Sequence, residues 1–157
     1  METKQKFLSF NLGAKDTAVI SLEYIAEVLQ ISLAEICGVP QMPNCVLGIY
    51  NWRGEMLWLV DAEEMLGYPS FSQGSNFLSK MMAIVLEHEG KFLGLLVRQL
   101  ADIEWMDTQE IKPLAAELFS SAMTPFLNGY FINSSEEMIL NVDALAIINA
   151  AVWEVHS

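Results

Sequence analysis

Histidine is the side chain that most often serves as a general base, and this chain has two histidines, His88 and His156. His88 lies in Glu87-His88-Glu89, which we expect to form a hairpin turn, and His156 is next to the last residue. The acids beside His88 suggest a metal site, but adjacent strand residues point to opposite faces and cannot converge on one ion. The histidines therefore predict neither a catalytic base nor a metal site.

Nucleophiles and cofactor-binding loops are equally hard to find. Cys37 and Cys45 are too far apart for a Cys-x-x-Cys pair and too few for a disulfide framework, so we expect both to be buried apolar residues. The sequence has no Gly-x-Ser-x-Gly elbow and no glycine-rich phosphate loop. Paired carboxylates could catalyse hydrolysis, but a solvated acidic face explains the acids more simply. We predict a protein that is not an enzyme and has no cofactor.

Arg53 is the residue whose chemistry stands out, because it is the only basic residue between Lys15 and Lys80, a stretch with eight acids. Trp, Tyr and Arg are the residue types that most often anchor protein interfaces. Two interpretations are open: Arg53 contacts a partner, or it only pairs with a nearby carboxylate, which contributes about 0–1 kcal/mol when exposed. The candidate contact surface is the segment from Gly48 to Gly54, which includes Tyr50, Asn51, Trp52 and Arg53.

The elements that must position this segment are short strands joined by tight turns. Runs of apolar and β-forming residues predict four strand pairs. These pairs are Phe7–Leu12 with Ala18–Leu22, Gly48–Asn51 with Met56–Val60, Met81–Leu86 with Phe92–Val97, and Gly129–Ile132 with Met138–Val142. Gly54 can supply the positive φ of its turn. Asp61 and Asp143 follow strands and are expected to cap short helices, and residues 114–122 are expected to form another.

A repeat organises the chain. EMLWLVDA at Glu55–Ala62 reappears as EMILNVDA at Glu137–Ala144, 82 residues later, and Ala26-Glu27-Val28 is echoed by Ala101-Asp102-Ile103. The repeat indicates a duplicated unit, although short strand patterns also agree by chance. Two small β units have too little core alone, so they should pack together. We predict one domain over residues 1–157, with a subdomain at about 7–66, a linker at about 67–80, a second subdomain at about 81–148 and a C-terminal segment at 149–157.

Composition and charge exclude several classes of partner. Twenty acidic and eight basic residues give a net charge of -12, which repels nucleic-acid phosphates and anionic membrane surfaces. No apolar run reaches the roughly eighteen residues that a membrane span requires, and the N-terminus lacks the pattern of a signal peptide. We therefore expect a cytoplasmic protein without a nucleic-acid partner or direct membrane insertion.

The candidate segment also carries a family resemblance. VPQMPNCVLGIYNWRGEMLWLVDA resembles the signature of CheW-type coupling proteins: a Pro-x-x-Pro lead-in, then Gly-x-x-Asn-Leu-Arg-Gly, then an apolar strand ending in Val-Asp. FLSFNL, IAEVL, GKFLGLLV, LADI, IKP, FLNGYF and MILNVDAL resemble the other blocks of the family in order. The resemblance implies a mainly β fold: two five-stranded SH3-like β-barrels around a shared core, with a few short helices.

The same resemblance implies a function without catalysis. Members are adaptors that join the cytoplasmic tip of a methyl-accepting-type receptor to the regulatory domain of a CheA-type histidine kinase, which implies recruitment to membrane receptor arrays. By position, Arg53 and Glu27 are implied to contact the receptor, and Gly48 resembles the side that meets the kinase. The residues implied to line the groove between the barrels are Ile25, Val28 and Ile103.

This chain departs from the family pattern at three positions. Trp52 replaces the usual Leu, Trp58 stands where Pro is common, and Arg98 follows Val97 where the family often has Asp. These substitutions and the acidic charge suggest specialised partners, and a pathway for twitching or phototaxis instead of flagellar chemotaxis. The alternative function is a small-ligand-binding or regulatory domain that uses the groove between the barrels as a pocket. An enzyme ranks third.

Overall fold

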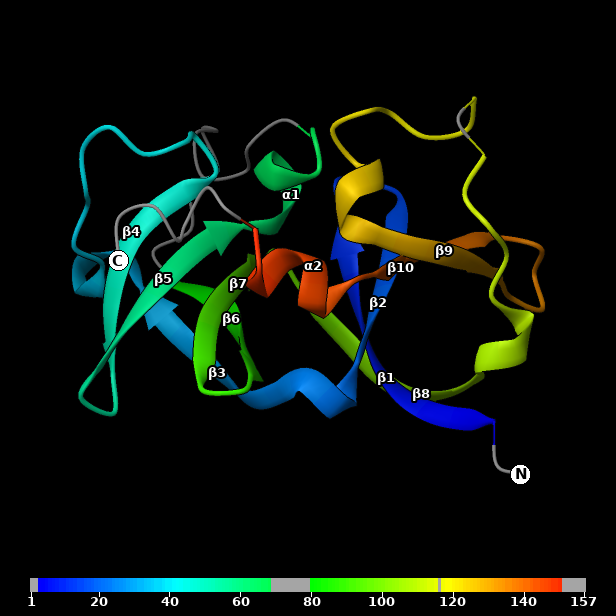
Figure 1. The fold of residues 1–157 in the computed structure, drawn as a ribbon, viewed down its shortest axis with the longest axis horizontal. Helices are drawn as coiled ribbons and strands as arrows, with labels where there is room; N and C mark the ends of the chain where they lie inside the picture. The colour runs from blue at the N-terminus through cyan, green and yellow to red at the C-terminus, as the bar shows by residue number, and fades with distance from the viewer. Residues whose placement is uncertain (1–2, 69–79, 116, 151–157) are drawn as a thin grey trace.

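The computed structural model describes residues 3–68, 80–115 and 117–150 as two β-barrels side by side (Figure 1). The first barrel is a five-stranded sheet with the order β8-β1-β2-β10-β9. Its strands are β1 (Lys4–Leu12), β2 (Asp16–Ser21), β8 (Leu100–Asp107), β9 (Leu127–Ile132) and β10 (Met138–Val142). The second barrel has the order β3-β6-β7-β5-β4. Its strands are β3 (Ile25–Ser32), β4 (Val46–Trp52), β5 (Glu55–Asp61), β6 (Lys80–His88) and β7 (Lys91–Val97).

Each sheet closes through the segment that follows one of its edge strands. After β3, the backbones of Cys37 and Ile49 exchange hydrogen bonds of 2.9 and 2.8 Å, which connects this segment to β4. After β8, Lys112 and Tyr130 exchange bonds of 2.8 and 3.1 Å, which connects that segment to β9. Closure satisfies backbone groups that an open edge would leave unpaired.

All four predicted strand pairs are present as antiparallel hairpins. Arg53 and Gly54, with φ of 53° and 79°, form the turn between β4 and β5, as the twist of a two-residue hairpin requires. Asp61 caps helix α1 (Ala62–Met65) by accepting bonds from the amides of Glu63 and Glu64, and Asp143 caps α2 (Ala144–Ile148). The predicted caps and most of the predicted turns are therefore confirmed. The turn expected at Glu87-His88-Glu89 is shorter, because Glu87 and His88 pair within β6 and β7 and the turn consists of Glu89 and Gly90.

Four short 3-10 helices complete the described elements: η1 (Leu22–Tyr24), η2 (Leu33–Glu35), η4 (Thr108–Glu110) and η5 (Thr124–Phe126). The helix expected over residues 114–122 is wrong, because the described residues there form isolated turns. Forming the first turn of a helix is unfavourable, and a helix this short adds few further hydrogen bonds to offset that free energy. The serines in this segment also favour turns. Cys37 is exposed and not buried as expected, whereas Cys45 is half-buried and burial raises the pKa of its thiol to about 11.

The repeat has a structural counterpart. When β3-β6-β7-β5-β4 is matched to β8-β1-β2-β10-β9, each neighbouring pair agrees in direction, including the parallel pairs β5–β7 and β10–β2. In this match Val28 corresponds to Ile103. Val28 pairs with Ile84 in the second barrel, and Ile103 pairs with Leu8 in the first. The two repeats therefore consist of β1 to β5 and β6 to β10.

The sheets do not follow the subdomain boundaries predicted along the chain, at 7–66 and 81–148. Each barrel combines the first two strands of one repeat with the last three of the other. Local patterns predict hairpins, but pairings such as β1 with β8 and β3 with β6 join distant segments that a hydrophobic pattern does not assign to each other. Most of the predicted linker and C-terminal segment, residues 69–79 and 151–157, lies outside the described residues.

Three clusters of buried apolar residues form the core of the two barrels. The largest joins the two barrels, with Phe10, Ile20 and Val60 among its fully buried members. A second cluster fills the second barrel around Ile31 and Leu57, and a third fills the first barrel around Phe7 and Phe131. The shared cluster includes strands of both barrels, so the barrels form one folding unit.

Candidate functional site

The β4–β5 hairpin presents Arg53 at its tip. The side-chain oxygen of Asn51 accepts a 3.0 Å hydrogen bond from the amide of Gly54 and fixes the turn. Asn51 and Gly54 are exposed, and the Arg53 side chain is 68% exposed. The hairpin therefore presents the Arg53 guanidinium to solvent on a turn that the Asn51 hydrogen bond holds in place.

Glu27 on β3 joins this hairpin from the opposite edge of the same sheet. Its Oε1 lies 3.0 Å from Arg53 Nη2 and accepts a 2.8 Å hydrogen bond from Trp52 Nε1. The guanidinium carbon of Arg53 lies 5.0 Å from the centre of the Trp52 ring, within cation–π range. The structure thus brings together three predicted site residues, which we call the Arg53 cluster: Glu27, Trp52 and Arg53.

The geometry bears on both interpretations of Arg53. The arginine does pair with a carboxylate, but one from a distant strand, and an ion pair this exposed contributes about 0–1 kcal/mol. The guanidinium also keeps most of its surface open to solvent. Pairing with Glu27 therefore orients Arg53 more than it stabilises the fold.

Trp52 is a support for this cluster and not an exposed contact. It is 7% exposed, and its ring lies 5.1 Å from that of Phe92 in the core of the second barrel. Only its indole N–H reaches the surface carboxylate of Glu27. The Trp in place of the usual Leu therefore adds a hydrogen bond that a leucine could not make.

Gly48 lies where the backbone leaves no room for a side chain. Its φ is 149°, and a Cβ added there would lie 2.2 Å from the carbonyl oxygen of Cys37, where the barrel closes. Gly129 occupies the matching position in the first barrel, 2.4 Å from the carbonyl oxygen of Lys112 by the same measure. Barrel closure therefore requires glycine at both positions, independently of any partner.

The other predicted site residues are dispersed. Ile25 and Val28 are half-buried on β3 and pack against the shared core, and Tyr50 packs against the core of the second barrel. Ile103 is 59% exposed on β8, at the position in the first barrel that matches Val28. The predicted groove residues thus occupy equivalent edge strands of the two barrels.

An ion pair between exposed Arg98 and a buried carboxylate was not predicted from the sequence. Glu63 is fully buried and accepts bonds of 2.9 and 2.8 Å from Nε and Nη2 of Arg98, and one of 2.9 Å from the amide of Gly13. It connects α1 of one barrel to the β1–β2 turn of the other. The available signal was Arg98 itself, which departs from the family pattern. Hydrogen bonding to Glu63 raises the pKa of Arg98.

The described residues were compared with the patterns of metal sites and membrane-spanning helices. Within 3–68, 80–115 and 117–150, no three His, Cys, Asp or Glu side chains gather closely enough to hold a metal ion. Every helix in these parts of the chain is too short to cross a lipid bilayer. His156 lies outside the described residues.

Comparison with known proteins gives consistent matches. The CheW-like domain model matches residues 6–152. The chemotaxis protein CheW of Klebsiella aerogenes is 25% identical over 93% of this chain and 82% of its own length. CheW of Helicobacter pylori is 24% identical over 72% of this chain and 64% of its own length. The crystal structure of the scaffolding protein CheW from Thermoanaerobacter tengcongensis matches 88% of both chains, with a TM-score of 0.73 and 22% identity, and has the same fold. Since the family model spans nearly the whole sequence, the chain belongs to the CheW-like domain family.

Proposed function

We propose that this protein is a non-catalytic adaptor of a chemosensory pathway, which joins a receptor's cytoplasmic tip to the regulatory domain of a CheA-type histidine kinase. Family membership across residues 6–152 is the observation that carries the proposal. Two similar proteins are named chemotaxis proteins, and the similar solved structure is a scaffolding protein. The adaptor would act in the cytoplasm at membrane receptor arrays.

The mechanism is assembly and requires no bond to be broken. The shared core makes the two barrels one body, so partners bound to different faces would be held in fixed geometry. A receptor state that fits this geometry better would then favour one state of the kinase. The Arg53 cluster is the proposed receptor-facing anchor, with Glu27 orienting the arginine.

Specialised partners are part of the proposal. Trp52 and Arg98, which depart from the family pattern, make hydrogen bonds to Glu27 and Glu63 that the more common residues could not make. A pathway for twitching or phototaxis fits these substitutions and the acidic charge. A screen against every receptor tip and CheA-type kinase of the host would identify the partners.

The charge reversal Arg53→Glu tests the anchor. It should weaken binding to the cognate receptor tip at least about tenfold, because a hot-spot arginine at an interface contributes about 2 kcal/mol or more. The melting temperature should change little, because the pair with Glu27 is exposed. Lys15→Glu, the same charge change on an exposed turn of the other barrel, is the control. Equal receptor binding by both variants would contradict the proposed anchor.

A further inference from the structure

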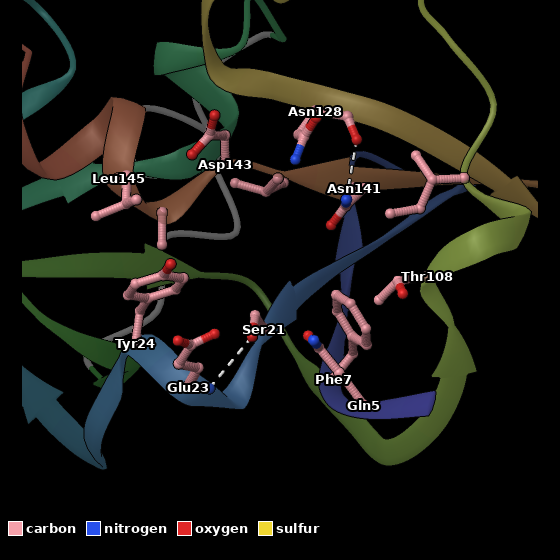
Figure 2. Close-up of a pocket in the computed structure, with 13 residues that line it drawn as sticks. Gln5, Phe7, Ser21, Glu23, Tyr24, Thr108, Asn128, Asn141, Asp143 and Leu145 are labelled. Atoms are coloured by element: carbon pink, nitrogen blue, oxygen red, sulfur yellow. Dashed lines mark hydrogen bonds between the residues drawn. The ribbon is translucent and has the colours of Figure 1, made fainter. Parts of the chain in front are cut away.

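A cavity of about 380 Å³ lies in the first barrel, away from the Arg53 cluster. Figure 2 shows Phe7 of β1, Tyr24 of η1 and Asn141 of β10 arranged around a common space. Glu23 and Asp143 also line it. The volume falls at the small end of the range for ligand pockets, about 300–1,000 Å³.

Asn141 is a buried polar residue on a strand that is otherwise apolar at its buried positions. It is 5% exposed, and its Nδ2 donates a 2.9 Å hydrogen bond to the carbonyl oxygen of Asn128. Its side-chain oxygen receives no hydrogen bond from the described residues, and in Figure 2 it points away from Asn128 toward the space between Tyr24 and Phe7. This oxygen borders the cavity, where it can accept a hydrogen bond from a donor on a ligand.

The second barrel is an internal control for the polarity of this cavity. In the matched strand registers, Asn141 corresponds to Leu59, Ser21 to Leu96, and Gln5 to Met81. All three counterparts are buried apolar residues that fill the second barrel. The fold therefore accommodates apolar residues at these positions. In the first barrel the polar residues also have local roles, because Ser21 caps η1 and Asn141 bonds to Asn128. Local departures of this kind are expected at functional sites.

The electrostatics of the cavity favour a cation. Two carboxylates, Glu23 and Asp143, line it, and its lining residues include no Lys, Arg or His. Burial raises the pKa of the Tyr24 hydroxyl, and the charges of Glu23 and Asp143 raise it further. Thr108 also lines the cavity, and its hydroxyl donates a hydrogen bond to the carbonyl of Thr3.

We propose that this cavity binds an organic cation that carries N–H donors, an alkylammonium or a guanidinium group. The Asn141 oxygen and the two carboxylates accept its hydrogen bonds, and the faces of Phe7 and Tyr24 provide an aromatic wall that suits a cation. The group belongs either to a small free amine or to a basic side chain of a bound protein. The site lies outside the proposed receptor anchor and does not depend on the adaptor function.

The test is a titration of the 15N-labelled full chain, followed by NMR, with three probes. Agmatine represents the free cation, a capped pentapeptide with a central arginine represents a partner's side chain, and N-butylurea is an uncharged control of similar shape. Agmatine, the peptide, or both should shift the side-chain amide signal of Asn141, whereas N-butylurea should not. Binding of agmatine alone identifies a free ligand, and binding of the peptide alone identifies a partner's side chain.

Two variants confirm the location. Asn141→Leu introduces the residue that the second barrel carries at this position, so it should fold and should weaken binding of the cation at least about tenfold. Glu23→Gln changes an exposed residue, and it should weaken binding of the cation in the same direction. No shift with either cationic probe, equal shifts with N-butylurea, or unchanged affinity in Glu23→Gln would each overturn the proposal.

Discussion

Truncation of Arg98 tests how much its ion pair with the buried carboxylate of Glu63 stabilises the fold. The carboxylate of Glu63 is buried and accepts three hydrogen bonds, two of which come from Arg98. Arg98→Ala would leave this carboxylate with the amide of Gly13 as its remaining partner among these three bonds. Removing one partner of a buried ion pair costs about 3–5 kcal/mol. Because the Arg98 side chain is 42% exposed, water can reach part of the vacated space, and we expect about 3 kcal/mol.

Urea unfolding followed by tryptophan fluorescence measures this loss directly. The midpoint should fall without a change in slope, and the melting temperature should fall by about 6–12 °C for a domain of this size. Lys15→Ala, on an exposed turn, is the control and should leave the free energy of unfolding within about 0.5 kcal/mol. The double variant Arg98→Ala/Glu63→Gln should lose less than the sum of the single variants, because the uncompensated charge is gone. A loss below about 1 kcal/mol for Arg98→Ala, or strict additivity, would show that Arg98 does not compensate the buried charge of Glu63.

Three further predictions follow from the same geometry. Gly48→Ala should destabilise the fold by about 3 kcal/mol, because the added methyl group meets the closure of the second barrel at a positive φ, whereas Gly38→Ala, which has open space, should be nearly neutral in the same urea unfolding. Trp52→Phe should lower the free energy of unfolding by about 1–2 kcal/mol through loss of the indole hydrogen bond, and an unchanged urea midpoint would contradict that bond. At pH 8, iodoacetamide should modify exposed Cys37 well before Cys45, whose thiol pKa of about 11 keeps it protonated; mass spectrometry of digests measures both, and equal rates would contradict the burial of Cys45.

The strands, turns and caps could be predicted because they depend on neighbouring residues. Alternating apolar residues specify a strand, Gly54 specifies a turn, and Asp61 and Asp143 specify helix starts. The sequence repeat even matched the correct strands, β5 with β10 and β3 with β8. The exchange of strands between the barrels was not predictable, because residues 82 apart with the same pattern can pair within either half equally well.

The candidate site could likewise be predicted only in part from the sequence. Charge counting singled out Arg53, but its partner Glu27 was implied only by the family resemblance, since the two residues lie on strands at opposite edges of one sheet. The cavity around Asn141 was missed for the same reason. Its lining residues come from segments that only the strand registers bring together, and each of them alone resembles an ordinary surface or core residue.

Assembly of a three-component complex tests whether this protein is an adaptor between receptor and kinase. The cognate receptor tip, displayed on a bead or membrane template, is mixed with the kinase regulatory domain in the presence and absence of this protein. We expect the kinase domain to be retained with the receptor only when this protein is present, and we expect Arg53→Glu to reduce retention whereas Lys15→Glu does not. Retention of the kinase domain that is unaffected by this protein, or failure of this protein to bind either component, would contradict the adaptor function.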